Sequence, residues 1–150
     1  MPFTLTSTAF GDGRAIPLEF SCDGDDVAPP LAWSDPPAGT KTFALIADDP
    51  DAPAGTWVHW VLFNMPGSAT TASDGAAQAT PGRNDFQRTG YGGPCPPPGK
   101  PHRYYFKLYA LDTRLSLRAG ATKADVERAM QGHVLATAQL MGTYGRRRVR

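Results

Sequence analysis

The nine residues from 56 to 64, TWVHWVLFN, constrain the fold more than any other segment of the chain. They are rich in β-branched and aromatic residues, which favours a β-strand. Alternate side chains of a strand point to opposite faces. The predicted faces are Trp57, His59, Val61 and Phe63 on one side and Val58, Trp60 and Leu62 on the other. Both faces are apolar, so the segment is predicted to be an interior strand of a two-layer structure.

The rest of the chain reads as short strands separated by turns. Glycine and proline make up 31 of the 150 residues without any period, which excludes long helices for most of the chain. Alternating or apolar runs predict further strands around 3–5, 16–20, 31–33, 42–47 and 103–111. Pro17 places the second of these at a sheet edge. The tract from Met65 to Pro101 is polar and loop-like, and so long a loop in a compact domain is usually functional or disordered.

One helix is predicted near the C-terminus. Thr122 and Asp125 resemble a capping box. Residues then repeat at steps of four and three, which indicates a single amphipathic helix that ends at Gly142: Val126, Met130, His133, Thr137, Leu140 and Tyr144. His133 is expected to be a packing residue on this helix. The predicted fold is mainly β, an antiparallel two-sheet β-sandwich with one amphipathic helix, in a single domain over residues 1–150.

Charge and hydropathy limit the partners and the location of the protein. The net charge is +1, but four arginines lie within residues 146–150, so residues 1–145 carry about −3, which argues against nucleic-acid binding by the folded body. The basic segment 146–150 is predicted to be a solvated, flexible tail, with contact to an anionic surface as the alternative.

No run approaches the roughly 20 apolar residues of a membrane span. The N-terminus lacks the pattern of a secretory signal, so a cytoplasmic location without integral membrane contact is expected. Cys22 and Cys95 are then expected to be reduced, and a Cys22–Cys95 bridge stays open as the alternative.

Two polar segments flank the two strongest strands. In the first, Pro50 and Pro53 hold Asp49 and Asp51 in a rigid turn, which is predicted to lay a carboxylate beside His59. In the second, residues 91–101 combine glycines, whose backbone amides no side chain covers, with several prolines, and exposed amides in a tight concavity favour anions. His102 and Tyr104 follow on one face of the next strand. Together these groups predict a pocket.

Several motifs in these segments resemble the phosphatidylethanolamine-binding protein family, in particular its bacterial, Raf-kinase-inhibitor-like branch. They are DPDAP at 49–53, WVHW at 57–60, GYGGPCPP at 90–97 and HRYYF at 102–106, with CDGDDVAPPLAW at 22–33 and GTYGR at 142–146. The resemblance implies a β-sandwich with a small pocket for phosphate-like anions and phospholipid head groups. The pocket residues that it implies are Asp49, Asp51, Pro53, Trp57, His59, Gly92, Gly93, Pro94, His102 and Tyr104. Arg103 is implied to be a structural ion-pair partner of one of the two aspartates.

The chain is shorter than eukaryotic members of the family after its predicted helix, so kinase inhibition is not transferred to it. We expect a non-enzymatic protein without a cofactor, which binds a phosphate-like anion or a phospholipid head group. Asp49 would orient His59, or donate as a protonated acid, while the amides of Gly92 and Gly93 face the anion.

Three alternatives stay open. The pocket could recognise a phosphorylated segment of a protein partner. Asp49, Asp51, His59 and His102 could form the metal site of a hydrolase. Cys95 and His102 could form a nucleophile pair. A monomer and a homodimer are both compatible with the sequence.

Overall fold

The computed structural model describes residues 2–146, which form mostly β-structure with two short α-helices and one 3-10 helix. The strands are β1 (Thr4–Thr6), β2 (Arg14–Ala15), β3 (Ala32–Ser34), β4 (Thr42–Asp49), β5 (Trp57–Pro66), β6 (Thr80–Pro81), β7 (His102–Leu111) and β8 (Val134–Tyr144). The helices are the 3-10 helix η1 (Leu18–Phe20), α1 (Ala72–Ala76) and α2 (Lys123–Met130). The predicted strands at 31–33, 42–47, 56–64 and 103–111 are confirmed.

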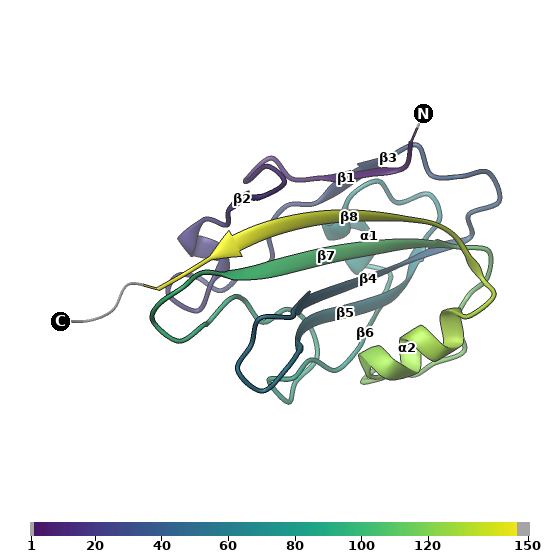
Figure 1. Ribbon diagram of the computed structural model, residues 1–150. Helices are drawn as coiled ribbons and strands as arrows, with labels where there is room; N and C mark the ends of the chain where they lie inside the picture. Colours follow the sequence, from purple (N-terminus) through teal and green to yellow (C-terminus); the bar gives the residue numbers. More distant parts are fainter. Residues whose placement is uncertain (1, 147–150) are drawn as a thin grey trace.

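The strands form two sheets. The larger sheet has the order β2-β8-β7-β4-β5-β6, and the smaller one pairs β1 with β3 (Figure 1). Neighbouring strands are antiparallel except for β2 and β8, which are parallel. The predicted mainly β fold with two sheets and a helix near the C-terminus is therefore confirmed.

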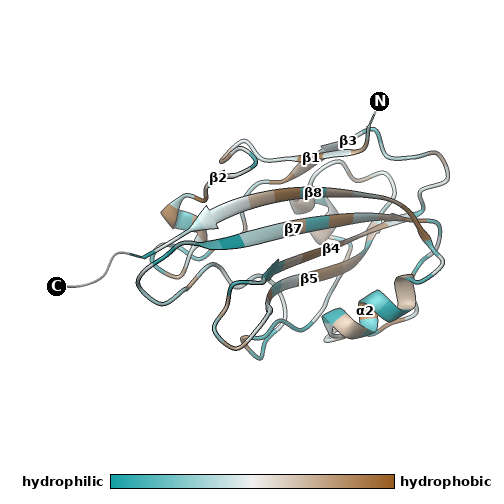
Figure 2. Ribbon diagram, in the orientation of Figure 1, coloured by the Kyte–Doolittle hydropathy of each residue, from teal (hydrophilic) through white to brown (hydrophobic). Residues whose placement is uncertain are grey.

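Hydrophobic side chains pack on both faces of the larger sheet, which explains why its central strands are apolar on both sides. Every residue of β4 is buried. Phe43 and Leu45 face the cluster that includes Trp33 of the smaller sheet. Ala44 and Ile46 face the cluster that includes Val126 of α2. Figure 2 shows the apolar character concentrated along the middle of the sheet.

A β-bulge in β5 changes the direction of His59. Ala47 pairs with Trp60 and Asp48 pairs with Val58, so His59 is an extra residue between two consecutive partners. A bulge interrupts strict alternation and turns the following side chains. The prediction that His59 shares a face with Val61 and Phe63 is therefore wrong. Those two residues pack in the α2 cluster, whereas His59 packs edge-on against Tyr104 on the opposite face.

The C-terminal helix is shorter than predicted. The capping box of Thr122 and Asp125 is present, but α2 ends at Met130 and the positive φ of Gly132, +81°, follows. The residues from Val134 form β8, which pairs with β7 along its whole length. Pairing with β7 satisfies backbone groups that would otherwise lie at an open edge, and this tertiary gain outweighs the helical spacing. His133 is exposed between the two elements, and its Nδ1 lies 2.8 Å from Asp112 Oδ1, so it is not a packing residue.

Two other expectations differ from the structure. The segment 16–20 is not a strand: Ser21 N–H donates to Leu18 O and closes the 3-10 turn η1. The long tract predicted from Met65 to Pro101 starts two residues later, because β5 extends to Pro66; it contains α1 and β6 and is otherwise irregular.

The cysteines and the C-terminal arginine also behave differently from the sequence prediction. Cys22 and Cys95 form a disulfide, so the expectation of two reduced thiols is wrong. Cys22 N–H donates to Pro94 O at 3.0 Å, which brings the two cysteines together across 73 residues of sequence. Arg146 is held by Asp23, with 2.8 Å between Nη2 and Oδ1, whereas the rest of the predicted tail lies outside the described residues. Within residues 2–146, no helix is long and apolar enough to cross a membrane.

Candidate functional site

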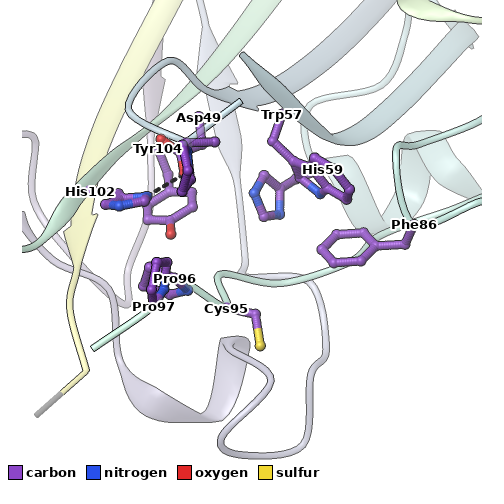
Figure 3. A pocket seen from close by; sticks show the side chains of 11 residues that line it. Asp49, Trp57, His59, Phe86, Cys95, Pro96, Pro97, His102 and Tyr104 are labelled. Atoms are coloured by element: carbon purple, nitrogen blue, oxygen red, sulfur yellow. Dashed lines mark hydrogen bonds and ion pairs between the residues drawn. The ribbon is translucent and has the colours of Figure 1, made fainter. Parts of the chain in front are cut away.

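A pocket with a volume of about 210 Å³ lies where β4 ends and where β5 and β7 begin. Because β4 is paired with both of these strands, the end of one and the starts of the others meet at one edge of the sheet. Figure 3 shows the side chains around the opening, with His59 and His102 on opposite sides of Tyr104. The lining residues are Asp49, Ala52, Pro53, Trp57, His59, Phe86, Cys95, Pro96, Pro97, His102 and Tyr104.

Asp49 and His102 form a buried pair at one side of the pocket. Asp49 Oδ2 accepts from His102 Nδ1 at 2.7 Å, and Asp49 Oδ1 accepts from the backbone N–H of Asp51 at 2.8 Å. The side chains of Asp49 and His102 are only 4% and 12% exposed. The predicted carboxylate–imidazole contact therefore exists, but its imidazole is His102 and not His59. The carboxylate is compensated on both oxygens, which lowers the cost of placing it beside an anion.

His59 lies across the pocket and is held by the loop that precedes the prolines. Its Nδ1 donates to Gly92 O at 2.7 Å, which fixes the tautomer and leaves Nε2 without a partner among residues 2–146. The imidazole packs edge-on against Phe86 and Tyr104, with ring centroids 5.3 and 5.1 Å away. Burial lowers the pKa of His59 below its usual value, because desolvation of the charged ring outweighs the bond to Gly92 and the nearby Asp49 carboxylate. The unliganded ring is thus neutral near pH 7.

Tyr104 supplies a hydroxyl without a protein partner. The residue is only 2% exposed, and its Oη is the one buried side-chain polar atom that lacks a hydrogen bond within the described part of the chain. Figure 3 shows this oxygen pointing into the space between the two imidazoles and Pro96. Burial raises the pKa of Tyr104, so the hydroxyl stays protonated and can donate. Its partner has to come from the pocket, as solvent or as ligand.

The glycine loop does not present free amides, contrary to the sequence expectation. Gly92 N–H donates to His59 O at 2.9 Å, and Gly93 N–H donates to Asp26 Oδ1 at 2.7 Å. A side chain at either position would overlap a neighbour, the Phe86 ring for Gly92 and the backbone of Phe20 for Gly93. These glycines are required for close approach of two chain segments. Gly92, Gly93 and Pro94 are buried and do not line the pocket.

Asp51 and Arg103 form an ion pair beside the pocket. Arg103 Nη2 lies 2.8 Å from Asp51 Oδ1, and both Nε and the backbone N–H of Arg103 donate to Asp51 Oδ2 at 2.9 Å. These bonds lower the pKa of Asp51 to about 2. Asp51 does not line the pocket, and its role in the geometry is to join the 50–56 turn to the start of β7.

Five lining residues were not singled out as ligand contacts from the sequence: Ala52, Phe86, Cys95, Pro96 and Pro97. Phe86 reaches the pocket from the irregular tract, where it packs edge-on against Trp57 with centroids 5.5 Å apart. The local sequence around Phe86, NDF at 84–86, carries no spacing that indicates which strand it contacts. Within residues 2–146, no three histidine, cysteine or acidic side chains are grouped as metal ligands, and Asp51 is engaged by Arg103.

Comparisons with known proteins agree with this fold. The sequence model described as phosphatidylethanolamine-binding protein matches residues 6–145. A UPF0098 protein of Methanothermobacter thermautotrophicus is 48% identical over 149 residues, which cover 95% of this chain and 98% of that protein. A UPF0098 protein of Chlamydia muridarum is 48% identical over 146 residues, 93% of this chain and 97% of the relative.

Two solved structures are similar throughout. A homolog of phosphatidylethanolamine-binding protein from Chlamydia trachomatis, CT736, superposes with a TM-score of 0.90 at 45% identity and covers 96% of this chain and 97% of its own. YbcL of Escherichia coli, described as a new member of the mammalian PEBP family, gives a TM-score of 0.88 at 35% identity and covers 97% and 99%. The chain therefore belongs to the phosphatidylethanolamine-binding protein family. The names of these relatives indicate no catalytic activity.

Proposed function

We propose that the protein binds a phosphate-type anion in this pocket, free or as part of a head group, without catalysing a reaction. The observation that carries the proposal is the convergence of three donors on one small cavity: Nε2 of His59, the His102 ring and the orphaned Tyr104 hydroxyl. The volume of about 210 Å³ accommodates a phosphate group with a small substituent.

The two imidazoles donate to an anion only when they are charged. Each Nδ1–H is already used, that of His59 by Gly92 O and that of His102 by Asp49 Oδ2, so each Nε2 carries a proton only in the charged ring. The pKa of His59 is lowered by burial in the free protein, and a bound anion would raise it again. Anion binding is then coupled to the uptake of a proton. The affinity for the anion therefore rises as the pH falls from about 8 toward the pKa of His59 in the free protein.

The absence of catalysis is part of the proposal. The Cys95 sulfur is bonded to Cys22, so it is not a free nucleophile. Both carboxylate oxygens of Asp49 already accept a hydrogen bond, from His102 and from the Asp51 amide, which lowers the basicity that Asp49 would need as a general base. These contacts favour a binding role over hydrolysis.

The test is calorimetry with dimethyl phosphate, whose single charge does not change between about pH 5 and 8. We expect His59→Ala to lose binding by about tenfold or more, as for loss of a hydrogen bond to a charged group. His133→Ala is the matched control, because that histidine is exposed and pairs with Asp112 away from the pocket. Equal affinity of His59→Ala and wild type would overturn the proposal.

The source of the phosphate group is a separate question that the same assay can answer. Phosphoethanolamine represents a lipid head group, and a phosphoserine peptide represents a modified protein segment. Preference for the peptide by more than about tenfold would favour the interaction-module alternative.

A further inference from the structure

The Cys22–Cys95 disulfide lies at the surface and also forms part of the candidate pocket. Both half-cystines are exposed, and Cys95 lines the pocket. Figure 3 shows the Cys95 sulfur turned away from the cavity, while the adjoining Pro96 and Pro97 face it. A reagent in solution can therefore reach the bond without entering the pocket.

The segments that the disulfide joins are also held by hydrogen bonds, and we call residues 20–26 and 91–95 together the clasp. Cys22 N–H donates to Pro94 O at 3.0 Å. Tyr91 Oη donates to Phe20 O at 2.7 Å. Gly93 N–H donates to the 20–26 segment, as described above. Three hydrogen bonds therefore hold residues 91–94 of the clasp against residues 20–26 independently of the disulfide. Reduction of the disulfide would therefore leave this part of the structure in place.

The pocket wall formed by residues 95–97 depends more strongly on the disulfide. Two of its three residues are prolines, which have no N–H to donate. The backbone groups of Cys95 and Pro96 have no hydrogen-bond partner among the described residues. The next tie along the chain is the backbone bridge of Pro98 with Arg146, in which Gly99 N–H donates to Arg146 O at 3.1 Å. Between Pro94 and that bridge, the disulfide is the one covalent or hydrogen-bonded tie of the wall within residues 2–146, and the remaining restraint is the packing of the buried Pro96.

We propose that the Cys22–Cys95 bond is a reversible thiol-exchange site and that its reduction weakens anion binding by loosening the 95–97 wall. The reductant is a dithiol, small or protein-borne. One thiolate of the dithiol attacks a sulfur of the Cys22–Cys95 bond, that bond breaks, and the released cysteine thiolate takes up a proton. The second thiol of the dithiol, as its thiolate, then attacks the dithiol sulfur of the mixed disulfide, the bond to the protein cysteine breaks, and the released cysteine thiolate takes up a second proton. The protein gains two electrons and two protons, and the dithiol becomes a disulfide.

Exposure supports this role, since exposed disulfides are the labile and regulatory ones. A wall that is already ordered before binding increases the affinity, because binding then does not have to include the entropic cost of ordering it. Loss of that order for one or two residues corresponds to a reduction of affinity of about tenfold. This part of the inference rests on the proposed anion-binding function, whereas the accessibility and the loosening do not.

The experiment compares oxidised and reduced protein in two independent measurements. Hydrogen exchange followed by mass spectrometry reports on the peptide 91–104, with a β4 peptide as the internal reference. Calorimetry with dimethyl phosphate reports on the pocket. After treatment with about 1 mM dithiothreitol, the intact mass should show a gain of two hydrogens. We then expect faster exchange at Gly99, whose amide is the first hydrogen-bonded one after the proline-rich wall, unchanged exchange in β4 and about tenfold weaker binding.

Two variants make the result decisive. Cys22→Ser lies outside the pocket lining and should reproduce the reduced state without a reductant. A Cys22→Ser, Cys95→Ser double variant should show no response to dithiothreitol. A native protein whose disulfide resists the dithiol, or whose exchange at Gly99 is unchanged after reduction, would overturn the redox inference. Absence of binding by the oxidised protein, with faster exchange on reduction, would instead overturn only the anion-binding function.

Discussion

Replacement of Tyr104 by phenylalanine separates the stability of this protein from its proposed ligand binding. The hydroxyl is buried and has no partner within residues 2–146, so its removal breaks no hydrogen bond of the described structure. A hydroxyl paired with protein is worth about 1 kcal/mol of stability, while a buried and unpaired one costs about 1–3 kcal/mol. Because pocket solvent offsets part of that cost, we expect Tyr104→Phe to be neutral or up to about 1 kcal/mol more stable.

Ligand binding should change in the opposite direction. A hydrogen bond from a neutral hydroxyl to a charged acceptor is worth about 1.5–3 kcal/mol, so dimethyl phosphate should bind about 10- to 100-fold more weakly. The assays are urea unfolding at constant m-value and calorimetry on the same samples.

Tyr91→Phe is the control for this pair of measurements. Its hydroxyl donates to Phe20 O at 2.7 Å, so its removal should cost about 1 kcal/mol of stability. The reasoning would be refuted if Tyr104→Phe were destabilised like the control while it kept wild-type affinity, since the hydroxyl would then have a protein partner.

Other positions give equally specific expectations. Lys123→Met leaves the buried Asp48 carboxylate with only Lys107, 3.6 Å away, and should cost about 1–3 kcal/mol in thermal unfolding; an unchanged Tm would show that Lys123 contributes nothing. Because the folded pKa of Asp51 is lowered to about 2, its ion pair stabilises the fold above about pH 4 and this contribution disappears as the pH falls toward 2. The stability difference between wild type and Asp51→Asn, below about 1 kcal/mol for this exposed pair, should therefore shrink over that range, and a constant difference would contradict it. Gly93→Ala would place a Cβ against the backbone of the clasp and should cost about 2–3 kcal/mol in urea unfolding, whereas wild-type stability would mean that the clasp can move apart.

The sheet was predictable from the sequence because its central strands carry a strong local signal. β5 and β7 combine β-branched and aromatic residues with period-two alternation, and their positions were correct within two residues. The family motifs likewise located Asp49, His59, His102 and Tyr104 around one cavity. These features depend on short stretches of chain.

The errors arose where distant segments decide the structure. In β8, Ala138, Leu140, Gly142 and Tyr144 are buried at intervals of two, but the same stretch also satisfies a helical spacing. Only the unpaired edge of β7 distinguishes the two readings, and that edge is a property of the assembled sheet.

The bulge and the disulfide were hidden for the same kind of reason. The sequence around His59 shows ordinary period-two alternation. The bulge that turns His59 to the other face of the strand depends on the register of β4 against β5. The pairing of Cys22 with Cys95 depends on the close approach of two glycine- and proline-rich segments, which composition does not encode.

Two neighbouring aspartates at the end of β4 make this strand intolerant of changes in length. Asp48 binds Lys123 at 2.7 Å toward α2, and Asp49 binds His102 at 2.7 Å on the other side of the sheet. Deletion or insertion of one residue upstream in the strand would turn each aspartate to the opposite face of the sheet. Asp48 would then point toward His102 and Asp49 toward Lys123. Length variation in natural or engineered forms of this protein should therefore be confined to the turns, or should occur within β4 in steps of two.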